Sequence, residues 1–240
     1  MDKIELNKIY NEDCLEGMKR IPDKSVDMIL CDLPYGTTAC KWDTVIPFEP
    51  LWEQYERVIK DNGAIVLFGS EPFSSHLRLS NINKYKYEWI WKKRPVNFLN
   101  AKKQPLRETE NIMVFNSKVY FPQGLIYKPR INKRSNSTET NGEHGRANVS
   151  LYTNYPRQLL EYVGERGLHP TQKPVALFEY LIKTYTNAGE TVLDNCMGSG
   201  TTAIACLNTN RNFIGFELDK GYFDMATKRI EEHEQQFKVD

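Results

Sequence analysis

Short apolar segments that alternate with helix-like patterns constrain the fold of this chain more than any other feature. Most of these segments are rich in β-branched and aromatic residues, and none is long enough for a helix, so each is expected to be a buried strand. They occupy residues 26–31, 64–69, 112–115, 191–194 and 213–216. Such nearly continuous apolar strands are typical of a parallel sheet that is covered on both faces.

Between these segments the apolar residues recur at helical spacing. From Leu51 to Ile59 they follow the i, i+1, i+4, i+7, i+8 rule, and Asn62-Gly63 provides the stop. A second pattern runs from Phe178 to Tyr185 after Pro174, and a last helix is expected over residues 219–236. Strands that alternate with helices predict an α/β protein with a doubly wound, mostly parallel sheet.

The composition is that of an ordinary soluble globular protein. The 240 residues suit one α/β domain with an insertion, and 40% of them are hydrophobic and 26% charged. No apolar stretch approaches the ~18–20 residues that span a bilayer, and the charged N-terminus has no signal-peptide core. The five cysteines have the spacing of neither a zinc site nor a disulfide framework. We therefore expect a cytoplasmic protein without a structural metal.

The middle of the chain differs in charge from the rest. Between Lys92 and Arg146 there are twelve Lys or Arg and four Asp or Glu residues, a balance of +8, whereas the whole chain carries only +1. The strand–helix alternation also stops in this region. We expect residues 1–91 and 168–240 to form the α/β domain and residues 92–167 to form an inserted recognition region. Such an insert is typical of a polyanion-binding surface, and a solvated basic loop is the alternative.

The segment LDNCMGSGTT, residues 193–202, has the features of a cofactor loop. A strand ends at Asp194, and Gly198 and Gly200 lead into a helix whose first N–H groups are available to a ligand. No lysine follows Gly200, so the segment is not a P-loop. The next strand ends at Glu217, where a carboxylate commonly accepts hydrogen bonds from ribose hydroxyls. The pattern predicts an adenosine-containing cofactor without phosphates, which S-adenosylmethionine fits; a tight turn beside a surface acid is the alternative.

The strand at residues 26–31 ends in Asp32-Leu33-Pro34-Tyr35. Pro34 fixes its own φ and favours an extended Leu33, so the turn should be rigid, with its carbonyl groups aimed at one spot. The Asp32 carboxylate adds a second acceptor, and Tyr35 adds a flat ring. Two acceptors and a ring suit the exocyclic amino group of a nucleobase that stacks on Tyr35. An ordinary turn is the alternative for this motif taken alone.

Four motifs together give the sequence a resemblance to the amino-group DNA methyltransferases, which methylate adenine at N6 or cytosine at N4. DLPY resembles their D/N/S-P-P-Y catalytic motif, with Leu33 in place of the first proline. DNCMGSGTT is similar to their D-P-F-x-G-S-G-T cofactor motif, with Asn195 and Cys196 in place of Pro and Phe. HPTQKP (169–174) resembles their third signature, and IYNEDCLEGM (9–18) resembles the segment whose acid, here Asp13, lies near the cofactor adenine. The catalytic motif comes first, which is the order of the β subgroup.

The resemblance implies a Rossmann-like methyltransferase fold and direct methyl transfer from S-adenosylmethionine to an amino group of a base flipped out of duplex DNA. It implies no covalent enzyme intermediate, and the neutralisation of a charged sulfonium needs no metal ion. The catalytic residues that it implies are Asp32, Leu33, Pro34 and Tyr35. The cofactor-binding residues that it implies are Asp13, Cys14, Asp32, His169, Thr171, Lys173, Asp194, Cys196, Gly198, Ser199, Gly200, Thr201, Glu217 and Leu218. The basic residues expected against DNA phosphates are Lys92, Lys93, Arg94, Lys102, Lys103, Lys133 and Arg134.

Several alternatives are compatible with the sequence. Aspartate at the first motif position favours adenine N6, because the resemblance associates serine more with cytosine N4, and cytosine N4 is the nearest alternative. RNA and a protein side-chain amide are more distant ones. From another class, a nucleic-acid-binding module with a decayed site is the alternative, and the intact Asp32, Tyr35 and Glu217 argue against it. The target sequence is not legible. One short insert is compatible with a homodimer, and a restriction endonuclease partner is left open.

Overall fold

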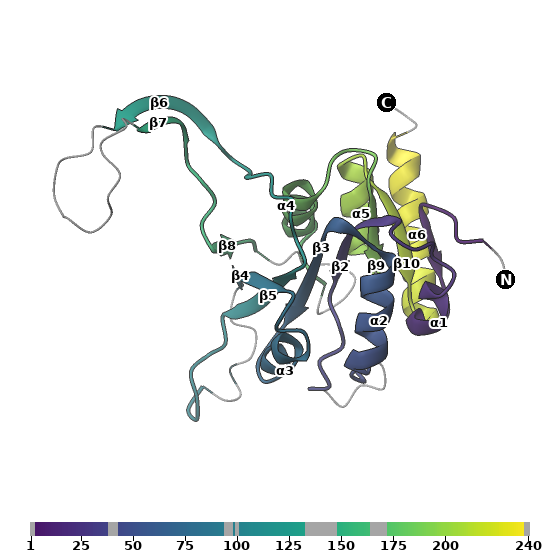
Figure 1. The fold of residues 1–240 in the computed structure, drawn as a ribbon. Coiled ribbons are helices and arrows are strands. Elements are labelled where there is room, and N and C mark those ends of the chain that lie inside the picture. Colours follow the sequence, from purple (N-terminus) through teal and green to yellow (C-terminus); the bar gives the residue numbers. More distant parts are fainter. Residues whose placement is uncertain are drawn as a thin grey trace. The chain divides into compact units, whose positions relative to one another are not determined.

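The computed structural model describes residues 3–37, 43–93, 98, 101–132, 148–163 and 172–237 (Figure 1). The chain divides into two compact units. The first consists of Met1–Phe121 and Gln158–Asp240, and the second is Pro122–Arg157. Among the described residues, no helix combines the length and the apolar character needed to cross a bilayer.

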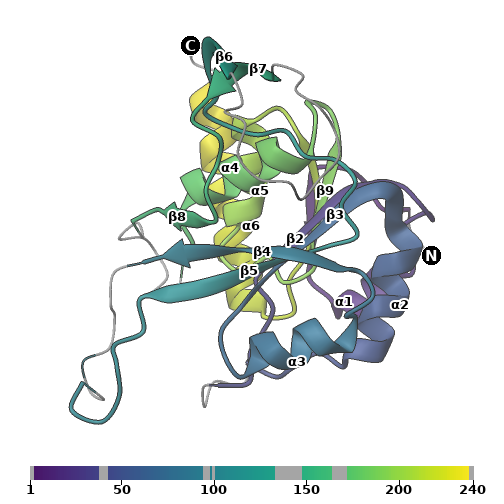
Figure 2. The same ribbon diagram turned by 60° about the vertical axis from the view of Figure 1, so that its left-hand side comes forward.

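The first unit is built on one eight-stranded sheet, counted over the residues that the structure describes (Figure 2). Its strands are β1 (Lys8–Tyr10), β2 (Val26–Cys31), β3 (Ile59–Gly69), β4 (Tyr85–Lys92), β5 (Thr109–Phe115), β8 (Leu159–Glu161), β9 (Thr191–Asp194) and β10 (Asn212–Phe216). They follow the order β1-β10-β9-β2-β3-β5-β4-β8. Five of the seven neighbouring pairs are parallel, and β5 is antiparallel to both of its neighbours. The predicted mostly parallel α/β fold is confirmed.

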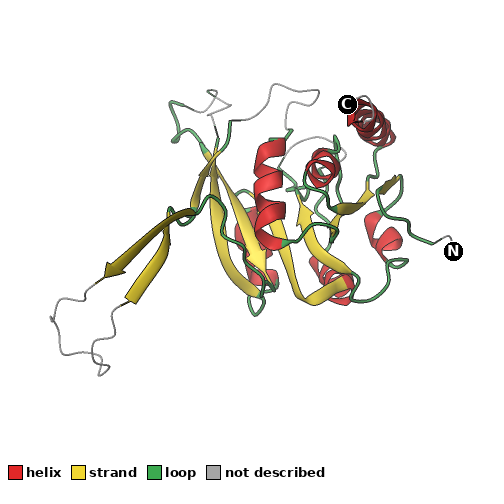
Figure 3. Ribbon diagram, turned by 90° about the horizontal axis from the view of Figure 1, so that it is seen from above, coloured by secondary structure: helices red, strands yellow, loops and turns green. Residues whose placement is uncertain are grey.

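Helices cover both faces of this sheet (Figure 3). On one face lie α4 (Val175–Tyr185), α5 (Thr201–Asn208) and α6 (Lys220–Phe237), and on the other lie α1 (Cys14–Met18), α2 (Phe48–Val58) and α3 (Phe73–Ser80). Consecutive side chains of a strand point to opposite faces. In β2, Met28 and Leu30 therefore join the first core cluster, whereas Ile29 and Cys31 join the second. The central strands are buried on both sides, as their apolar sequences predict.

The apolar runs locate the central strands better than the outer ones. The predicted ranges 26–31 and 191–194 coincide with β2 and β9, whereas β3, β5 and β10 begin earlier than predicted. The strands β1, β4 and β8 are not among the predicted ones. β1 and β8 have only three residues each, and β4 carries charged residues between its aromatic ones. The three predicted helical patterns correspond to α2, α4 and α6.

The second unit is an antiparallel hairpin of β6 (Ile126–Asn132) and β7 (Asn148–Thr153). It is shorter than the inserted region expected from the sequence, residues 92–167. The difference arises because β5 and β8 fall within that range but pair in the large sheet of the first unit. The basic segment of the sequence is thus partly α/β domain and partly hairpin.

Candidate active site

The carboxyl ends of four parallel strands meet at one edge of the large sheet. β2 pairs with β3 and β9, and β9 pairs with β10, all in parallel register. Asp32 follows β2, Asp194 ends β9, and Glu217 follows β10. The catalytic motif and the glycine motif of the sequence therefore lie at the same edge. This is the edge at which open α/β sheets bind their ligands.

The turn after β2 holds the Asp32 carboxylate and the Tyr35 ring together. The Tyr35 hydroxyl donates a hydrogen bond to Asp32 Oδ1 at 2.6 Å. Leu33, which stands where the family has its first proline, is buried in the core cluster under α2. The Tyr35 ring packs against Phe73, with ring centroids 5.1 Å apart. The acid and the ring of the motif are therefore placed by the core.

Asp43 stabilises the loop that follows this turn. Its carboxylate accepts hydrogen bonds from the Gly36 N–H at 2.8 Å and the Thr37 N–H at 2.9 Å. Gly36 has a φ of +67°, in the left-handed region where glycine is favoured. The loop after the catalytic motif is consequently held by a buried carboxylate.

Lys173, from the HPTQKP segment, supplies a cation to the same turn. Its Nζ lies 2.7 Å from Asp32 Oδ2 and 3.1 Å from Oε2 of Glu110, a residue of β5. Burial opposes the charge of Lys173, but the two carboxylates outweigh burial and raise the pKa of this lysine. Asp32 thus receives the Tyr35 hydroxyl on one oxygen and an ammonium on the other. His169 and Thr171 of the same segment lie outside the described residues.

The glycine loop after β9 permits close approach to its backbone. Gly198 and Gly200 have φ values of +53° and +82°, which side chains of other residues rarely tolerate. A Cβ atom at Gly200 would lie 3.2 Å from the Cβ of Ala226 on α6. Gly200 is also the N-cap of α5, so the first N–H groups of that helix face the loop.

Glu217 fastens the glycine loop to the end of β10. Its carboxylate accepts hydrogen bonds from the Gly198 N–H at 2.7 Å and the Asp219 N–H at 2.8 Å. Burial raises the pKa of Glu217. The next side chain, Leu218, is 70% exposed. The end of β10 therefore presents a carboxylate next to an exposed apolar side chain.

Asp194 is buried at the end of β9. The Thr202 hydroxyl donates a hydrogen bond to its carboxylate, and so does the Cys196 N–H, at 3.0 Å. Burial raises the pKa of Asp194 to about 7. This carboxylate is therefore poised to change its charge near neutral pH.

The start of α5 links the glycine loop to the Lys173 segment. The Thr201 hydroxyl donates to the Lys173 carbonyl at 3.5 Å, and Arg229 of α6 donates to the Ser199 carbonyl at 2.9 Å. Ser199 and Thr201 are both buried. The glycine loop and the Lys173 segment are therefore hydrogen-bonded to each other through α5.

Asp13 precedes α1, and the first residue of that helix, Cys14, contacts the segment that leads into the glycine loop. Asp13 Oδ1 caps α1 by accepting from the N–H groups of its second and third residues, at 2.8 and 3.2 Å. The Asn195 side-chain nitrogen lies 3.6 Å from the Cys14 sulfur and 3.5 Å from the Cys196 sulfur. The Tyr55 hydroxyl donates to Asn195 Oδ1 at 2.5 Å. An amide–thiol cluster thus stands where the family motif has Pro and Phe.

Comparison with known proteins decides the family. The model of the DNA methylase family, which covers N6- and N4-amino methyltransferases, matches residues 26–228. The chain belongs to this family. It is 27% identical over 249 residues to the Type II methyltransferase M.HpaI of Haemophilus parainfluenzae, across 93% of the chain and 74% of that protein. It is 29% identical over 257 residues to the Type II methyltransferase M.HinfI of Haemophilus influenzae, across 95% of the chain and 69% of that protein.

A solved structure has the same fold as this DNA methylase. The crystal structure of the M1.HpyAVI–SAM complex has a TM-score of 0.62 and is 30% identical. The match covers 92% of this chain and 98% of that one. The Rossmann-like methyltransferase fold and the family expected from the four motifs are confirmed.

The basic residues expected against phosphate occupy different environments in this methylase. Lys92 is exposed and lies 3.5 Å from Glu161. Lys102 and Lys103 are exposed in a turn. Lys93 instead pairs with the buried Glu110. Three more lie outside the described residues: Arg94, Lys133 and Arg134.

Glu110 is a site residue that the sequence motifs did not reveal. It belongs to β5, which carries TENIMVF, and its side chain is buried. The available signal was an acid next to an apolar strand, because a buried carboxylate requires a cationic partner. Nothing in the sequence indicated that the partner would be Lys173.

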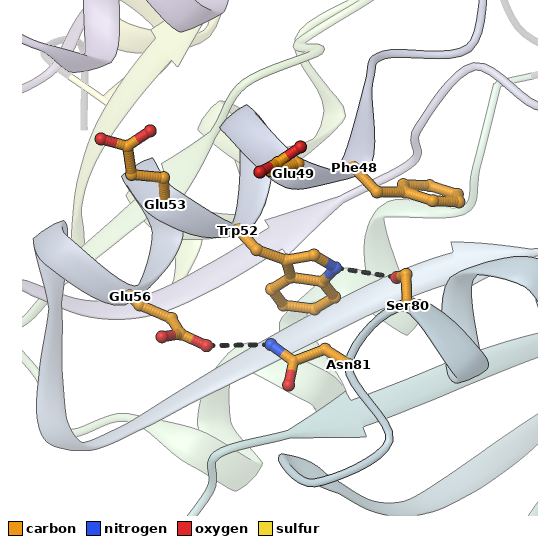
Figure 4. A pocket seen from close by; sticks show the side chains of 7 residues that line it. All are labelled: Phe48, Glu49, Trp52, Glu53, Glu56, Ser80 and Asn81. Atoms are coloured by element: carbon orange, nitrogen blue, oxygen red, sulfur yellow. Dashed lines mark hydrogen bonds between the residues drawn. The ribbon is translucent and has the colours of Figure 1, made fainter.

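A separate cavity of about 550 Å³ lies between α2 and α3 (Figure 4). In it, Trp52 Nε1 donates to Ser80 Oγ at 2.8 Å, and the Asn81 amide donates to Glu56 Oε1 at 2.9 Å. The lining residues are Phe48, Glu49, Trp52, Glu53, Glu56, Ser80 and Asn81. None of the expected site residues is among them, so this cavity is distinct from the edge that carries the methylase motifs.

Proposed function

We propose that this DNA methylase transfers a methyl group from S-adenosylmethionine to the N6 amino group of adenine in duplex DNA at a specific site. Membership of the DNA methylase family supports the reaction class. S-adenosylmethionine as the donor is supported by M1.HpyAVI, a 30% identical relative whose solved complex contains SAM. The observation that carries the proposal is the Asp32 carboxylate beside Tyr35 at the ligand-binding edge of the sheet.

The glycine loop and its neighbours fit this donor. In this proposal Glu217 would accept hydrogen bonds from the ribose, Leu218 would cover the adenine, and Asp194 would balance positive charge; the exposure of Leu218 and the position of Glu217 beside the glycine loop support these roles. These groups are acidic or apolar, which suits a cofactor that carries positive charge and has no phosphates. When bound, S-adenosylmethionine supplies a methyl group activated by its sulfonium.

The turn after β2 would make the amino group of the base nucleophilic. The exocyclic nitrogen of a nucleobase is a poor nucleophile, because its lone pair is conjugated into the ring. Hydrogen bonds from this amine to Asp32 and to the Leu33 carbonyl would localise the lone pair and aim it at the methyl group. Positioning of this kind can supply ~7–11 kcal/mol in favourable cases.

The target base must leave the duplex to reach this turn. Flipping costs about a few kcal/mol. Stacking on the ring of Tyr35 offsets part of this cost, since base–aromatic stacking contributes ~1–3 kcal/mol per base. Tyr35 is half-buried against Phe73, so the ring is held in place before the base arrives.

Aspartate at the first position of the motif favours adenine. Asp32 lies 2.7 Å from Lys173, and a carboxylate is a strong acceptor for an amine of either base. The preference for adenine comes from the motif resemblance, which associates serine at this position more with cytosine N4. The family covers both N6 and N4 chemistry. The assignment to adenine therefore rests on Asp32.

We further propose that the β6–β7 hairpin contacts the DNA through one of its two faces. Tyr127 pairs with Tyr152, and Arg130 pairs with Ser150, so these four side chains share a face. The two rings are 5.7 Å apart and exposed. Rings and a guanidinium on one face suit bases and phosphates. A homodimer would bring two such faces to one duplex, which sedimentation with and without DNA tests. A cytoplasmic location fits a DNA substrate in a bacterial cell, as for the Haemophilus relatives.

The decisive experiment is methyl transfer from labelled S-adenosylmethionine to unmethylated duplex DNA, followed by digestion and identification of the labelled nucleoside. Label in N6-methyldeoxyadenosine supports the proposal. Label in N4-methyldeoxycytidine keeps the mechanism and reverses the base. An absence of label in DNA, with cofactor binding intact, contradicts the proposal and directs the assay to RNA and protein.

A further inference from the structure

Four charged side chains of alternating sign form a continuous chain behind the catalytic turn. Asp32 contacts Lys173 at 2.7 Å, and Lys173 contacts Glu110 at 3.1 Å. Glu110 in turn pairs through its other oxygen with Lys93. The chain runs from the end of β2, through the segment before α4, to β5 and the residue after β4. We call it the ion chain.

The inner members of the ion chain are removed from water. The side chains of Lys173 and Glu110 are 9% and 8% exposed, whereas those of Asp32 and Lys93 are 31% and 21% exposed. A charge at such depth is costly unless each group has a partner of opposite sign. Burial opposes the charge of Glu110, but Lys173 and Lys93 lower its pKa. Each inner member therefore has two opposite charges.

Aromatic rings fix the position of the Lys173 ammonium. Its Nζ lies 5.8 Å from the ring centroid of Tyr35, 5.5 Å from that of Phe68 and 5.8 Å from that of Trp91. Trp91 is itself anchored, because its Nε1 donates to the Tyr162 carbonyl at 2.9 Å. Such a cage favours a cation by cation–π attraction. The rings and the two carboxylates together therefore hold the Lys173 ammonium in one position.

We propose that Glu110 and Lys93 are positioning residues of the methyl-transfer site, which act through Lys173 to hold the Asp32 carboxylate in its reactive orientation. The inference rests on the proposed function, since it assigns Asp32 to the target amine. Glu110 holds the Lys173 ammonium between the two carboxylates, so that Lys173 contacts Asp32 Oδ2 from one fixed direction. Lys93 acts together with Lys173 to favour the ionised form of Glu110. Lys93 thereby has a different role from the phosphate contact expected from the sequence.

The first test replaces Glu110 by Gln, which keeps the shape and removes the charge. We expect kcat to fall by about 10- to 100-fold, because misplacing a reacting group slows a reaction by this order. The Kd for S-adenosylmethionine and the KM for DNA should stay unchanged.

The pH profile of single-turnover transfer adds a second readout. Lys173 is faced by Asp32, Tyr35 and Glu110, with Lys93 behind Glu110. Without the Glu110 carboxylate, Lys173 loses one of the two charges that offset its burial, so its pKa falls and the alkaline limb of the pH–rate profile moves to lower pH.

The matched control is Asp27→Asn in the same sheet. Asp27 is about as buried as Glu110, with 10% against 8% of the side chain exposed, and it pairs with Lys60 at 2.6 Å near the other end of β2. This variant should lose stability while its alkaline limb stays in place. Glu110→Asp, which keeps the charge on a shorter side chain, should keep the alkaline limb and lower only kcat. A wild-type kcat and pH profile in folded Glu110→Gln, or the same shift in Asp27→Asn, would overturn the proposal.

A second test separates positioning from DNA contact at two adjacent lysines. Lys93→Met should lower kcat and leave the KM for DNA unchanged. Lys92→Met, at an exposed lysine, should raise the KM for DNA and leave kcat unchanged. If Lys93→Met instead raises the KM for DNA and reduces its salt dependence, Lys93 contacts phosphate and its positioning role is wrong.

A readout independent of methyl transfer distinguishes this proposal from the proposed function. Protein labelled with ¹³C at lysine side chains reports the titration of Lys173, and Lys173→Arg identifies its signal. We expect the Lys173 midpoint to drop in Glu110→Gln and to stay in Asp27→Asn. If the wild-type protein transfers no methyl group to DNA, the proposed function fails, while this titration still decides whether Glu110 controls Lys173.

Discussion

At the scale of single residues, Asp32 separates catalysis from binding. Asp32→Ala removes the acceptor for the amine but leaves Glu217 and the glycine loop intact. We expect kcat to fall by about 10²–10³-fold, comparable to the loss of one key stabilising group. Calorimetry should find a Kd for S-adenosylmethionine close to that of the wild type. Turnover near the wild-type rate would show that Asp32 is not the acceptor.

Asp194 gives the cofactor site a pH dependence. Burial holds its pKa at about 7, so the carboxylate is largely protonated below this pH. Because a cationic cofactor favours the ionised form, affinity for S-adenosylmethionine should rise as the pH increases from 6 to 8, by up to about tenfold per pH unit below the midpoint. Asp194→Asn should bind weakly with a flat profile over this range, and a steep profile in that variant would place the titrating group elsewhere.

The same residue links pH to stability with a definite sign. The folded pKa of about 7 lies above the ordinary value of 3.8, so the folded protein without cofactor disfavours the ionised form. The contribution of Asp194 to stability is therefore fully present below pH 3.8 and is lost as the pH rises to about 7. Urea unfolding at several pH values should show this loss in the wild type and a smaller one in Asp194→Asn.

At the scale of elements, Gly200 tests whether the glycine loop is built for close approach. Gly200→Ala places a Cβ 3.2 Å from Ala226 at a φ of +82°. A left-handed conformation costs a residue with a side chain about 1–2 kcal/mol, and the contact with α6 adds to this. Gly189 is a matched control, because its φ is +83° but a Cβ there would meet no atom within 4 Å. Gly200→Ala should lose more stability than Gly189→Ala and should alone weaken cofactor binding; equal effects would contradict a packing role for the loop.

The elements also show how far the sequence predicts this structure. β2 and β9 are predictable to the residue, because their apolar runs are buried on both faces and end at Asp32 and Asp194. β4 is harder to predict, because only Trp89 and Trp91 among its residues are buried. The catalytic and glycine motifs are local in sequence, so their strand ends and turns could be predicted. The contact of Lys173 with Glu110 joins residues far apart in the chain and depends on the strand order, which no local pattern encodes.

At the scale of the whole molecule, we expect the first unit to bind the cofactor and carry the catalytic turn, and the second unit to contact DNA. The buried residues of both core clusters come from the first unit, which also carries the glycine loop and the catalytic turn. In residues 122–132 and 148–157 the second unit has three basic residues and no acidic one. An isolated two-stranded hairpin is at most marginally stable in water. The first unit should therefore fold without the hairpin.

Replacing Pro122–Arg157 with a flexible linker of about ten Gly and Ser residues tests this division. We expect cooperative unfolding and a wild-type Kd for S-adenosylmethionine, because both cores and the glycine loop remain. Affinity for duplex DNA should fall and methyl transfer to DNA should be lost, because the face with Tyr127, Arg130 and Tyr152 is absent. The double variant Tyr127→Leu, Tyr152→Leu keeps the hairpin and should reproduce part of the loss. Full DNA affinity in the shortened protein would move recognition to the exposed lysines of the first unit.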